Sequence, residues 1–189
     1  MTKEDLKIFT KIPRIHTERL ELREITTSDL ADVNEYATDP EVSRYLLWSP
    51  HRDTTHTKLY LNNIRAKYKR AEFYDWGVVY GGKMIGTCGF TAFDISNNSA
   101  EIGYVLNRRF WGMGIGYEAA RAVMKFGFDR LGLERIEVRF MTDNLASEAL
   151  AKRCGMKREG TLRRAILAKG EYRDIGICSI LRNEYHEEI

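Results

Sequence analysis

The spacing of apolar residues along the chain predicts helices and strands in a definite order. Residues 19–23 alternate between apolar and polar with a period of two, which is typical of a strand with one buried face. Residues 117–131 instead carry apolar side chains at intervals of three and four, which predicts an amphipathic helix. Turn residues and helix caps bound the other predicted elements, which are helices over 27–36, from 39, over 53–69 and over 144–153, and strands over 73–80, 83–93, 100–106, 135–140, 156–168 and 172–181.

This order of elements predicts the fold class. A strand, several helices, three antiparallel strands, a helix, a strand, a helix and a final strand pair indicate an α+β fold with a mixed sheet, not a doubly wound sheet. No linker rich in Gly, Ser or Pro divides the chain, and all three prolines lie within the first 50 residues. We therefore expect one domain over residues 1–189.

Composition narrows the functional classes. The 189 residues suffice to bury a full core, and no apolar run approaches the roughly 18 residues that a membrane helix needs. The three scattered cysteines form neither a disulfide framework nor a metal motif, which favours a reducing, cytoplasmic setting. His51 and His56 lie five residues apart and do not share one helical face, so we expect no metal site. Residues 145–173 hold eight Lys or Arg against three acids, which suggests a phosphate-bearing partner.

The most distinctive segment is W-G-M-G-I-G at residues 111–116, at the start of the clearest helix. Glycine at every second position leaves the backbone bare, so that N–H groups and the positive end of the helix dipole can face a diphosphate. A Walker loop is excluded because no Gly-Lys-Ser/Thr ends the segment. A dinucleotide-binding turn, a coenzyme A loop and a simple tight turn all stay open on this pattern alone.

Longer motifs around this segment resemble one family. The run 107–119 resembles the acyl-CoA signature of the GNAT superfamily of N-acetyltransferases, with Trp111 where Gln or Arg is usual and Met113 where Lys is frequent. This variant is similar to the branch that acetylates the N-termini of ribosomal proteins, the RimJ/RimL-like group. Segments that match the same branch occur in order at 17–23, 100–104, 143–147, 154–156, 159–163 and 170–174. The resemblance covers residues 15–185.

The resemblance implies a fold and a cosubstrate site. In a GNAT-like, mostly antiparallel sheet flanked by helices, the strand 100–106 would carry a bulge and splay from the strand 135–140 as a V. Acetyl-CoA would lay its pantetheine arm in this V and its diphosphate on the glycine loop, within reach of Arg108 or Arg109. The residues implied in acetyl-CoA binding are Tyr104, Val105, Leu106, Arg109, Trp111, Gly112, Met113, Gly114, Ile115, Gly116, Asn144 and Ser147.

Acetyl transfer to an amine needs a proton acceptor for the amine and a proton donor for the leaving thiolate. Glu101 is the expected base, because it alternates against an apolar set and so points to the opposite strand face. Alternatively, Glu101 is only a surface carboxylate, or it is an anion that binds the amine. Ser147, which the resemblance places near the sulfur, competes with Tyr172 as proton donor. Asn144 is implied as a pantetheine ligand and is alternatively only a helix cap.

The acceptor pocket is expected from residues 39–76, where Tyr45, Trp48 and Trp76 could line it together with His51. Glu159 is a second candidate carboxylate for this pocket. An α-amine has a pKa near 8, against about 10.4 for a lysine side chain, so modest carboxylate bases suit the α-amine better.

The expected function is therefore acetyl-CoA-dependent acetylation of a primary amine, with a protein or peptide N-terminus as the favoured acceptor. A small-molecule amine (a polyamine, an amino acid or an antibiotic) and an inactive CoA-binding module are the alternatives. Nucleic acid is not expected as a partner, because the basic stretch has no RNA-stacking or helix-turn-helix signature. Neither a membrane nor a metal is expected, and the chain is expected to be a monomer or a homodimer.

Overall fold

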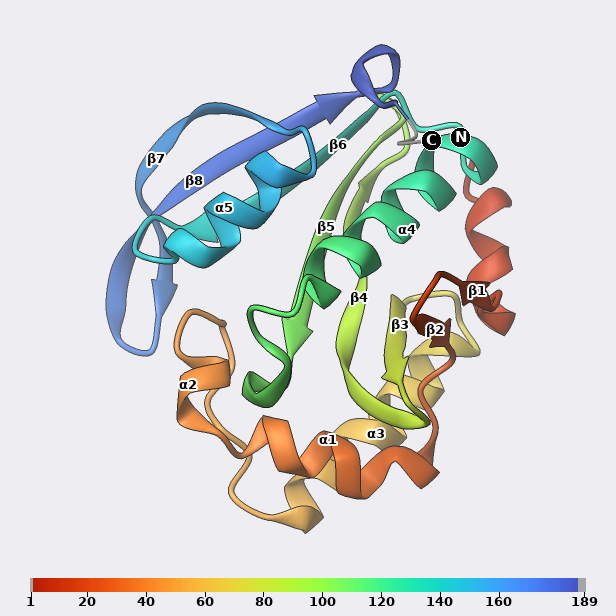
Figure 1. The fold of residues 1–189 in the computed structure, drawn as a ribbon, viewed down its shortest axis with the longest axis vertical. Coiled ribbons are helices and arrows are strands. Elements are labelled where there is room, and N and C mark those ends of the chain that lie inside the picture. The colour runs from red at the N-terminus through yellow and green to blue at the C-terminus, as the bar shows by residue number, and fades with distance from the viewer. Residues whose placement is uncertain (1, 187–189) are drawn as a thin grey trace.

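A single mixed sheet of eight strands forms the centre of the computed structural model, which describes residues 2–186 (Figure 1). The strand order across the sheet is β1-β2-β3-β4-β5-β6-β8-β7. All neighbouring strands pair antiparallel except β5 and β6, which are parallel. The strands are β1 (Ile15–His16), β2 (Leu20–Arg23), β3 (Tyr74–Tyr80), β4 (Lys83–Asp94), β5 (Ser99–Leu106), β6 (Arg135–Met141), β7 (Lys157–Ala168) and β8 (Glu171–Leu181).

Within residues 2–186, five α-helices flank this sheet. They are α1 (Leu30–Ala37), α2 (Pro40–Ser43), α3 (Thr54–Tyr68), α4 (Ile115–Arg130) and α5 (Leu145–Arg153). Side-chain caps fix several of their beginnings, as expected for Asp and Asn at N-caps. Asp39 accepts a hydrogen bond from the N–H of Glu41, Asp53 accepts one from His56, and Asn144 accepts one from Ser147. The predicted helices and strands are thus present, with shifts of a few residues at their ends.

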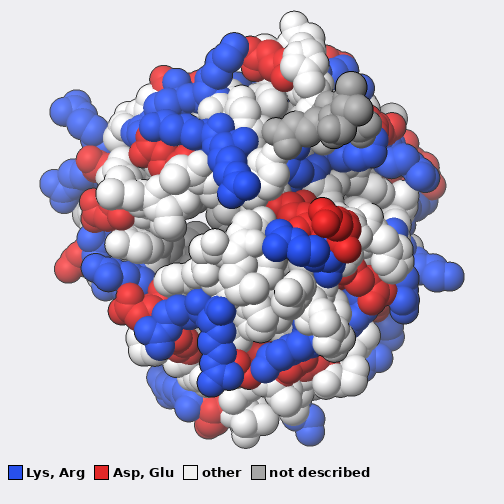
Figure 2. Space-filling view, viewed as in Figure 1, with Lys and Arg blue, Asp and Glu red and all other residues white. Residues whose placement is uncertain are grey.

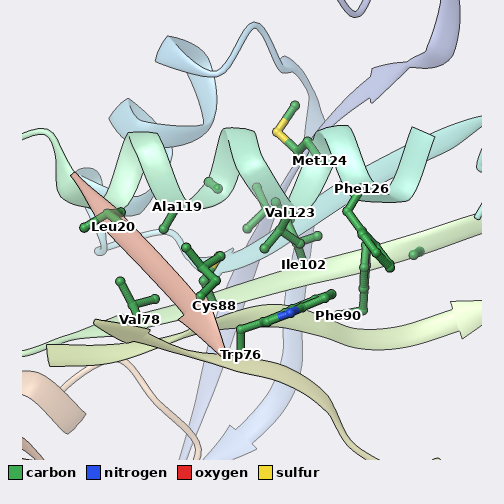
Figure 3. Packing of buried hydrophobic residues seen from close by; sticks show 14 of the residues in the cluster. Leu20, Trp76, Val78, Cys88, Phe90, Ile102, Ala119, Val123, Met124 and Phe126 are labelled. Carbon is green, nitrogen blue, oxygen red and sulfur yellow. The ribbon is translucent and has the colours of Figure 1, made fainter. Parts of the chain in front are cut away.

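Helix α4 covers one face of the sheet and buries the main core there. Its predicted apolar stripe packs on the inward side chains of β3, β4 and β5, among them Trp76, Phe90 and Ile102 (Figure 3). Aromatic rings meet edge to face in this core, with the Trp76 and Phe126 ring centroids 5.2 Å apart. Because side chains alternate along a strand, residues in the other phase, such as Thr87 and Val105, face the side on which α1 and α3 pack.

Strands β5 and β6 pair over only three residues and then separate. Ser99, Ala100 and Glu101 lie opposite Arg135, Ile136 and Glu137, and no pairing between the two strands continues beyond them. From Ile102 onward, the edge of β5 that faces β6 is therefore open. This confirms the predicted V-shaped splay and places its mouth beside the N-terminus of α4.

One local expectation was wrong. The bulge predicted in the strand 100–106 lies instead in its neighbour β4, where the register shifts between Phe90 and Ala92. The extra residue is Thr91, which opposes no single residue of β5. A bulge needs only one strand of a pair to carry the additional residue, and sequence alone does not say which strand does so.

Two N-terminal elements were not predicted from the pattern. A 3-10 helix covers Asp5–Lys11, and the two-residue strand β1 pairs with β2. Phe9 of the 3-10 helix is fully buried against Tyr74 and Trp76, so this segment closes one end of the core. No helix in the described part of the chain is long and apolar enough to cross a membrane.

Candidate active site

The glycine-rich segment forms a left-handed turn that leads directly into α4. Gly112 and Gly114 both have φ of +76°, a left-handed backbone conformation that residues with a side chain rarely adopt. Gly114 is the N-cap of α4. At the start of the helix, the N–H of Glu118 donates to the carbonyl of Gly114. The earlier N–H groups of the first turn, at Ile115 and Gly116, therefore point out of the helix without intrahelical acceptors. Such a helix start suits a phosphate group.

A polar contact between distant segments holds this turn. Glu118, in the first turn of α4, accepts hydrogen bonds from Thr17 Oγ1 at 2.5 Å, from the Arg19 N–H at 2.9 Å and from Arg19 Nε at 2.7 Å. Arg19 also donates from Nη1 to the carbonyl of Met113 at 2.9 Å. We call this set the latch (Thr17, Arg19, Glu118 and the Met113 carbonyl). It explains why the N-terminal motif at 17–23 accompanies the glycine loop.

A groove of about 480 Å³ runs from this turn into the splay. It is open at the surface and is mostly apolar, which is typical of sites for extended ligands. Its walls come from α2, β5, the glycine turn, α4 and α5. The lining residues are Glu41, Val42, Tyr45, Leu46, Tyr104, Val105, Leu106, Phe110, Trp111, Gly112, Gly114, Ile115, Gly116, Tyr117, Asn144, Ala146, Ser147, Ala149, Leu150 and Arg153.

The main chain of β5 presents hydrogen-bonding groups to the splay. The N–H of Asn107 bonds to the carbonyl of Ile85 on β4 at 2.7 Å. Val105 has the same phase as Asn107 and lies opposite Thr87, so its backbone is also directed at β4. Leu106 and Tyr104 have the opposite phase and present their N–H and C=O groups to the splay. The carbonyl of Leu106 accepts a bond from Trp111 Nε1 at 2.8 Å.

Ser147 and Tyr104 meet at the inner end of the groove. Their side-chain oxygens are 2.8 Å apart, and Ser147 is only 8% exposed. Asn144 caps α5 through the N–H of Ser147 at 3.2 Å and so fixes the serine at the first turn. Burial raises the pKa of Tyr104 well above its ordinary value, so the phenol keeps its proton at neutral pH. The pair can therefore supply a proton to a group in the splay.

Glu101 lies where β5 and β6 part, on the opposite strand face from Tyr104. Arg139 Nε is 3.5 Å from one of its carboxylate oxygens. Burial raises the pKa of Glu101 above its ordinary value, while Arg139 opposes this shift. Glu101 lines neither this groove nor the cavity that lies between the sheet and the helices α1 and α3. It can reach a reacting group only at the base of the splay or through a water molecule.

The cationic side chains expected at the diphosphate are not in the groove. Arg108 pairs with Asp39 at 2.9 Å and Arg109 pairs with Glu35 at 3.3 Å, both on the side of α1. Arg153 lines the groove instead, with its guanidinium 4.5 Å from the centre of the Tyr117 ring. In the sequence, Arg153 stands out only as part of the basic stretch, because helical spacing alone does not show that the end of α5 meets the start of α4.

Four of the eight Lys and Arg side chains at 145–173 form ion pairs within the described residues 2–186. Lys152 and Arg158 each lie 2.8 Å from Glu148, and Lys157 and Arg173 pair with Glu184 and Glu171. On the face shown in Figure 2, blue and red side chains are interspersed around a largely white centre. Among the Lys and Arg side chains of this stretch, Arg153 is the one that lines the groove.

Tyr172 and Glu159 lie outside the groove. Tyr172 is 58% exposed on β8, and Arg164 stacks 5.0 Å from its ring centre. Glu159 on β7 receives two bonds of 2.6 Å from Arg135 and one of 2.6 Å from Ser179. These hydrogen bonds, Arg135 first, lower the pKa of Glu159 to about 2, so it is a poor proton acceptor. Neither residue meets Ser147 or Glu101 in this structure.

The three aromatic residues expected at the acceptor pocket separate. Tyr45 lines the groove, and Trp48 lines a second cavity described below. The expectation for Trp76 is wrong: it is fully buried in the core, and its Nε1 donates to the carbonyl of Pro13 at 2.7 Å. Strand alternation turns Trp76 toward α4, where it has no open surface to offer a ligand.

A second cavity, of about 330 Å³, lies between the sheet and the helices α1 and α3. Val105 lines both this cavity and the groove, so the two meet at β5. The lining residues are Val33, Tyr36, Ala37, Trp48, Ser49, His51, His56, Tyr60, Thr87 and Val105. Within residues 2–186, no group of three or more His, Cys, Asp or Glu side chains is placed to hold a metal ion.

Comparison with known proteins identifies the family. The model of the acetyltransferase (GNAT) domain matches residues 19–157. The N-acetyltransferase p20 of Bacillus licheniformis is 35% identical over 173 residues, which cover 90% of this chain and 97% of that protein. The [ribosomal protein uS5]-alanine N-acetyltransferase of Escherichia coli is 25% identical over 171 residues, with 85% and 87% covered.

Solved structures agree on the fold. The crystal structure of a GNAT-family acetyltransferase from Bacillus anthracis matches with a TM-score of 0.81 and 27% identity. The match covers 91% of this chain and 100% of that one. Because the family model matches most of this chain, residues 19–157, the chain belongs to the GNAT acetyltransferase family and is an acyltransferase enzyme.

Proposed function

We propose that this enzyme moves the acetyl group of acetyl-CoA to the α-amine at the N-terminus of a protein or peptide. The observation that carries the cosubstrate assignment is the continuity of the groove, from the glycine turn at α4 to the open edge of β5. A diphosphate fits the first end and an extended pantetheine arm fits the second. Acetyltransferases of this family use acetyl-CoA, and the residues present suit it.

In this proposal, the diphosphate binds the N–H groups at Ile115 and Gly116, with Arg153 as the nearby cation. The pantetheine arm lies along β5 and takes hydrogen bonds from the backbone of Tyr104 and Leu106, much as an added strand would. One of these N–H groups donates to the thioester oxygen, which gains negative charge as the amine attacks.

Ser147 protonates the leaving thiolate in this scheme. Its hydroxyl is buried in the groove and hydrogen-bonded to Tyr104, which can restore the proton. We favour Ser147 over Tyr172 because Tyr172 lies on an exposed hairpin away from the groove. Glu101 accepts the proton that the amine nitrogen loses after attack. Its position at the base of the splay and its raised pKa support this role.

The assignment of an α-amine as acceptor rests on the ionisation of amines at neutral pH and on sequence similarity to an N-terminal acetyltransferase. At pH 7 roughly a tenth of an α-amine is already neutral, against well under a hundredth of a lysine side chain. The similarity to the uS5-alanine N-acetyltransferase, whose name states an N-terminal acceptor, supports the same class and with it the RimJ/RimL-like branch.

A competition assay tests the acceptor. Purified protein and acetyl-CoA are given peptides that carry both a free N-terminus and an internal lysine, alongside spermidine and an aminoglycoside. Mass spectrometry should find the acetyl group on the α-amine, with preference for a small first residue. Acetylation only of lysine, spermidine or the aminoglycoside would replace the α-amine by that acceptor. Binding of acetyl-CoA without transfer to any amine would contradict the proposed reaction.

A further inference from the structure

The cavity between the sheet and α1–α3 opens beside the reacting end of the groove. Val105 lines both spaces, and Thr87, directly opposite Val105 on β4, lines the cavity floor. The cosubstrate groove lies on the α4–α5 side of the sheet edge. An acceptor that enters through the cavity would therefore approach β5 from the opposite face, so the two substrates would not compete for space.

His51 is fixed in one orientation in the wall of this cavity. Its side chain lies in a residue that is only 9% exposed, and its backbone N–H donates to the carbonyl of Ala37 at 2.8 Å. Its Nδ1 lies 2.9 Å from Thr57 Oγ1. The Thr57 hydroxyl in turn donates to Asn34 Oδ1 at 2.8 Å.

This chain of bonds determines the tautomer of His51. A threonine hydroxyl has one proton, and here that proton is directed at an amide oxygen, which can only accept. Thr57 Oγ1 must therefore accept from His51, so Nδ1 carries the ring proton. In the neutral ring, Nε2 is then left with a lone pair.

The Nε2 atom is available to a ligand. It has no hydrogen-bond partner among residues 2–186 and is not fully buried, and His51 lines the cavity. We take the cavity as the side from which a ligand reaches it. Burial, and after it the neighbouring His56, lowers the pKa of His51, so the ring is neutral at pH 7.

We infer that this cavity is the acceptor site and that His51 Nε2 takes the proton that the acceptor's ammonium group must lose before attack. The inference rests on the proposed function and adds a residue to it. The surroundings are apolar and aromatic, with Trp48 and Tyr60 ring centroids 5.6 and 5.3 Å from that of His51. Such surroundings disfavour a charged ammonium and so assist its loss of a proton.

The proton balance closes with the residues already named. The ammonium gives one proton to His51, which passes it to solvent. The neutral amine then bonds to the thioester carbon and loses a second proton to Glu101. The C–S bond breaks, and the thiolate takes a proton from Ser147. Ser147 regains a proton from solvent through Tyr104, and Glu101 releases the proton it accepted to solvent. The sum is ammonium plus acetyl-CoA giving acetamide, coenzyme A and one proton.

Other titratable groups face the same cavity and have to be separated from His51. On α3 these are His56, whose ring stacks on His51 at 4.3 Å, and Tyr60, and on α1 there is Tyr36. Asp75 on β3 lies on the same side of the sheet and interacts electrostatically with both tyrosines. Burial raises the pKa of Asp75 to about 7, so it titrates in the range of interest.

Two substitutions at His51 test the inference. His51→Asn keeps a donor at the position of Nδ1 for Thr57 but removes Nε2, whereas His51→Gln keeps a polar atom near Nε2 that cannot be protonated. At pH 7 both should lower kcat/KM for the acceptor by about 10²-fold, with unchanged affinity for acetyl-CoA. The loss should shrink as the pH rises past 8, because the free amine then needs no proton acceptor.

Asp75→Asn is the matched control. Asp75 lines neither the cavity nor the groove, so Asp75→Asn should keep the pH dependence of the wild type. His56 lowers the pKa of His51, so His56→Gln should shift the pH dependence without abolishing it. Wild-type pH dependence in both His51 variants would overturn the inference and leave the proposed function standing. The assay uses whichever amine the wild type acetylates, and absence of transfer to every amine would reject both.

A readout independent of turnover is the tautomer. Nitrogen-15 NMR of the protein should show the His51 ring protonated on Nδ1 at pH 7, with Thr57→Val weakening that preference. Addition of an amine that the wild type acetylates should shift the Nε2 resonance of His51 in the presence of coenzyme A. An Nε2-protonated ring in the wild type, or an Nε2 resonance that no accepted amine moves, would contradict the assignment.

Discussion

Single residues in this enzyme take their chemical character from their immediate neighbours. Glu101 and Glu159 are both glutamates on strands, yet burial raises the pKa of Glu101 while Arg135 and Ser179 lower that of Glu159 to about 2. Only Glu101 is therefore suited to accept a proton near neutral pH. By residue type alone, both glutamates are candidates for the base. The difference between their pKa values arises from contacts of Glu159 that join β6, β7 and β8.

Replacement of Glu101 by glutamine tests its part in the attack step. Glu101→Gln should lower kcat by about 10²-fold with acetyl-CoA affinity unchanged, since the change removes a proton acceptor and keeps the shape. The loss should persist at high pH, because the proton released after attack still has to leave. Steady-state kinetics from pH 6 to 9 measure this.

The matched control is Glu137→Gln. Glu137 lies opposite Glu101 in the parallel pairing and binds the same Arg139 at 2.8 Å, so its loss removes a similar charge from the same cluster. Its effect on kcat should be far smaller. A raised KM with unchanged kcat in Glu101→Gln would show that Glu101 only holds the acceptor.

At the scale of elements, the site depends on segments that are far apart in sequence. The glycine turn is positioned by Thr17 and Arg19 through Glu118, about a hundred residues away. Burial raises the pKa of Glu118, but the hydrogen bonds from Thr17 and Arg19 lower it by more, so the group stays ionised. A carboxylate with a lowered folded-state pKa stabilises the fold above its unfolded pKa, and this contribution fades as the pH falls below about 4.5.

We predict that Glu118→Gln weakens acetyl-CoA binding by roughly fivefold, or about 1 kcal/mol, because the turn is no longer held for the diphosphate. Calorimetric titration with acetyl-CoA measures the change. Glu134→Gln, which removes an exposed ion pair with Arg182 beyond the other end of α4, should leave the affinity as it is. Equal affinities for Glu118→Gln and the wild type would show that the latch does not position the turn.

At the scale of the whole molecule, the two faces of the sheet have different tasks. The face covered by α4 holds the aromatic core, and the opposite face, toward α1 and α3, holds the cavity with His51. The groove that we propose for acetyl-CoA runs along the open edge of β5 between them. This division places Trp76 in the core and Trp48 at the cavity, although both were candidates for the same pocket.

Trp76→Phe should therefore change stability and not acceptor kinetics. The smaller ring leaves a cavity beside Phe126 and an unpaired carbonyl at Pro13, so we expect a loss of about 2 kcal/mol in the free energy of unfolding. Thermal or urea unfolding measures this loss, and KM for the amine should stay at the wild-type value. A higher KM with normal stability would return Trp76 to the acceptor pocket.

The sequence by itself determined the elements, the fold class and the glycine segment that forms one end of the groove. Hydrophobic period, caps and turn glycines are local properties, so α4, its Gly114 cap and the left-handed Gly81-Gly82 turn follow from a few adjacent residues. The glycine loop is a single short segment, which is why it could be found without a structure. The bulge at Thr91 could not be found in this way, because it depends on how two strands pair.

Only the tertiary structure decided which residues surround the reacting centre. The groove, the latch and the His51 cavity each join segments that are distant in sequence, and such contacts arise from sheet register and helix packing. Arg153 replaced Arg109 in the groove because the end of α5 meets the start of α4. The tautomer of His51 was fixed by Asn34 and Thr57, on two helices that no local pattern relates.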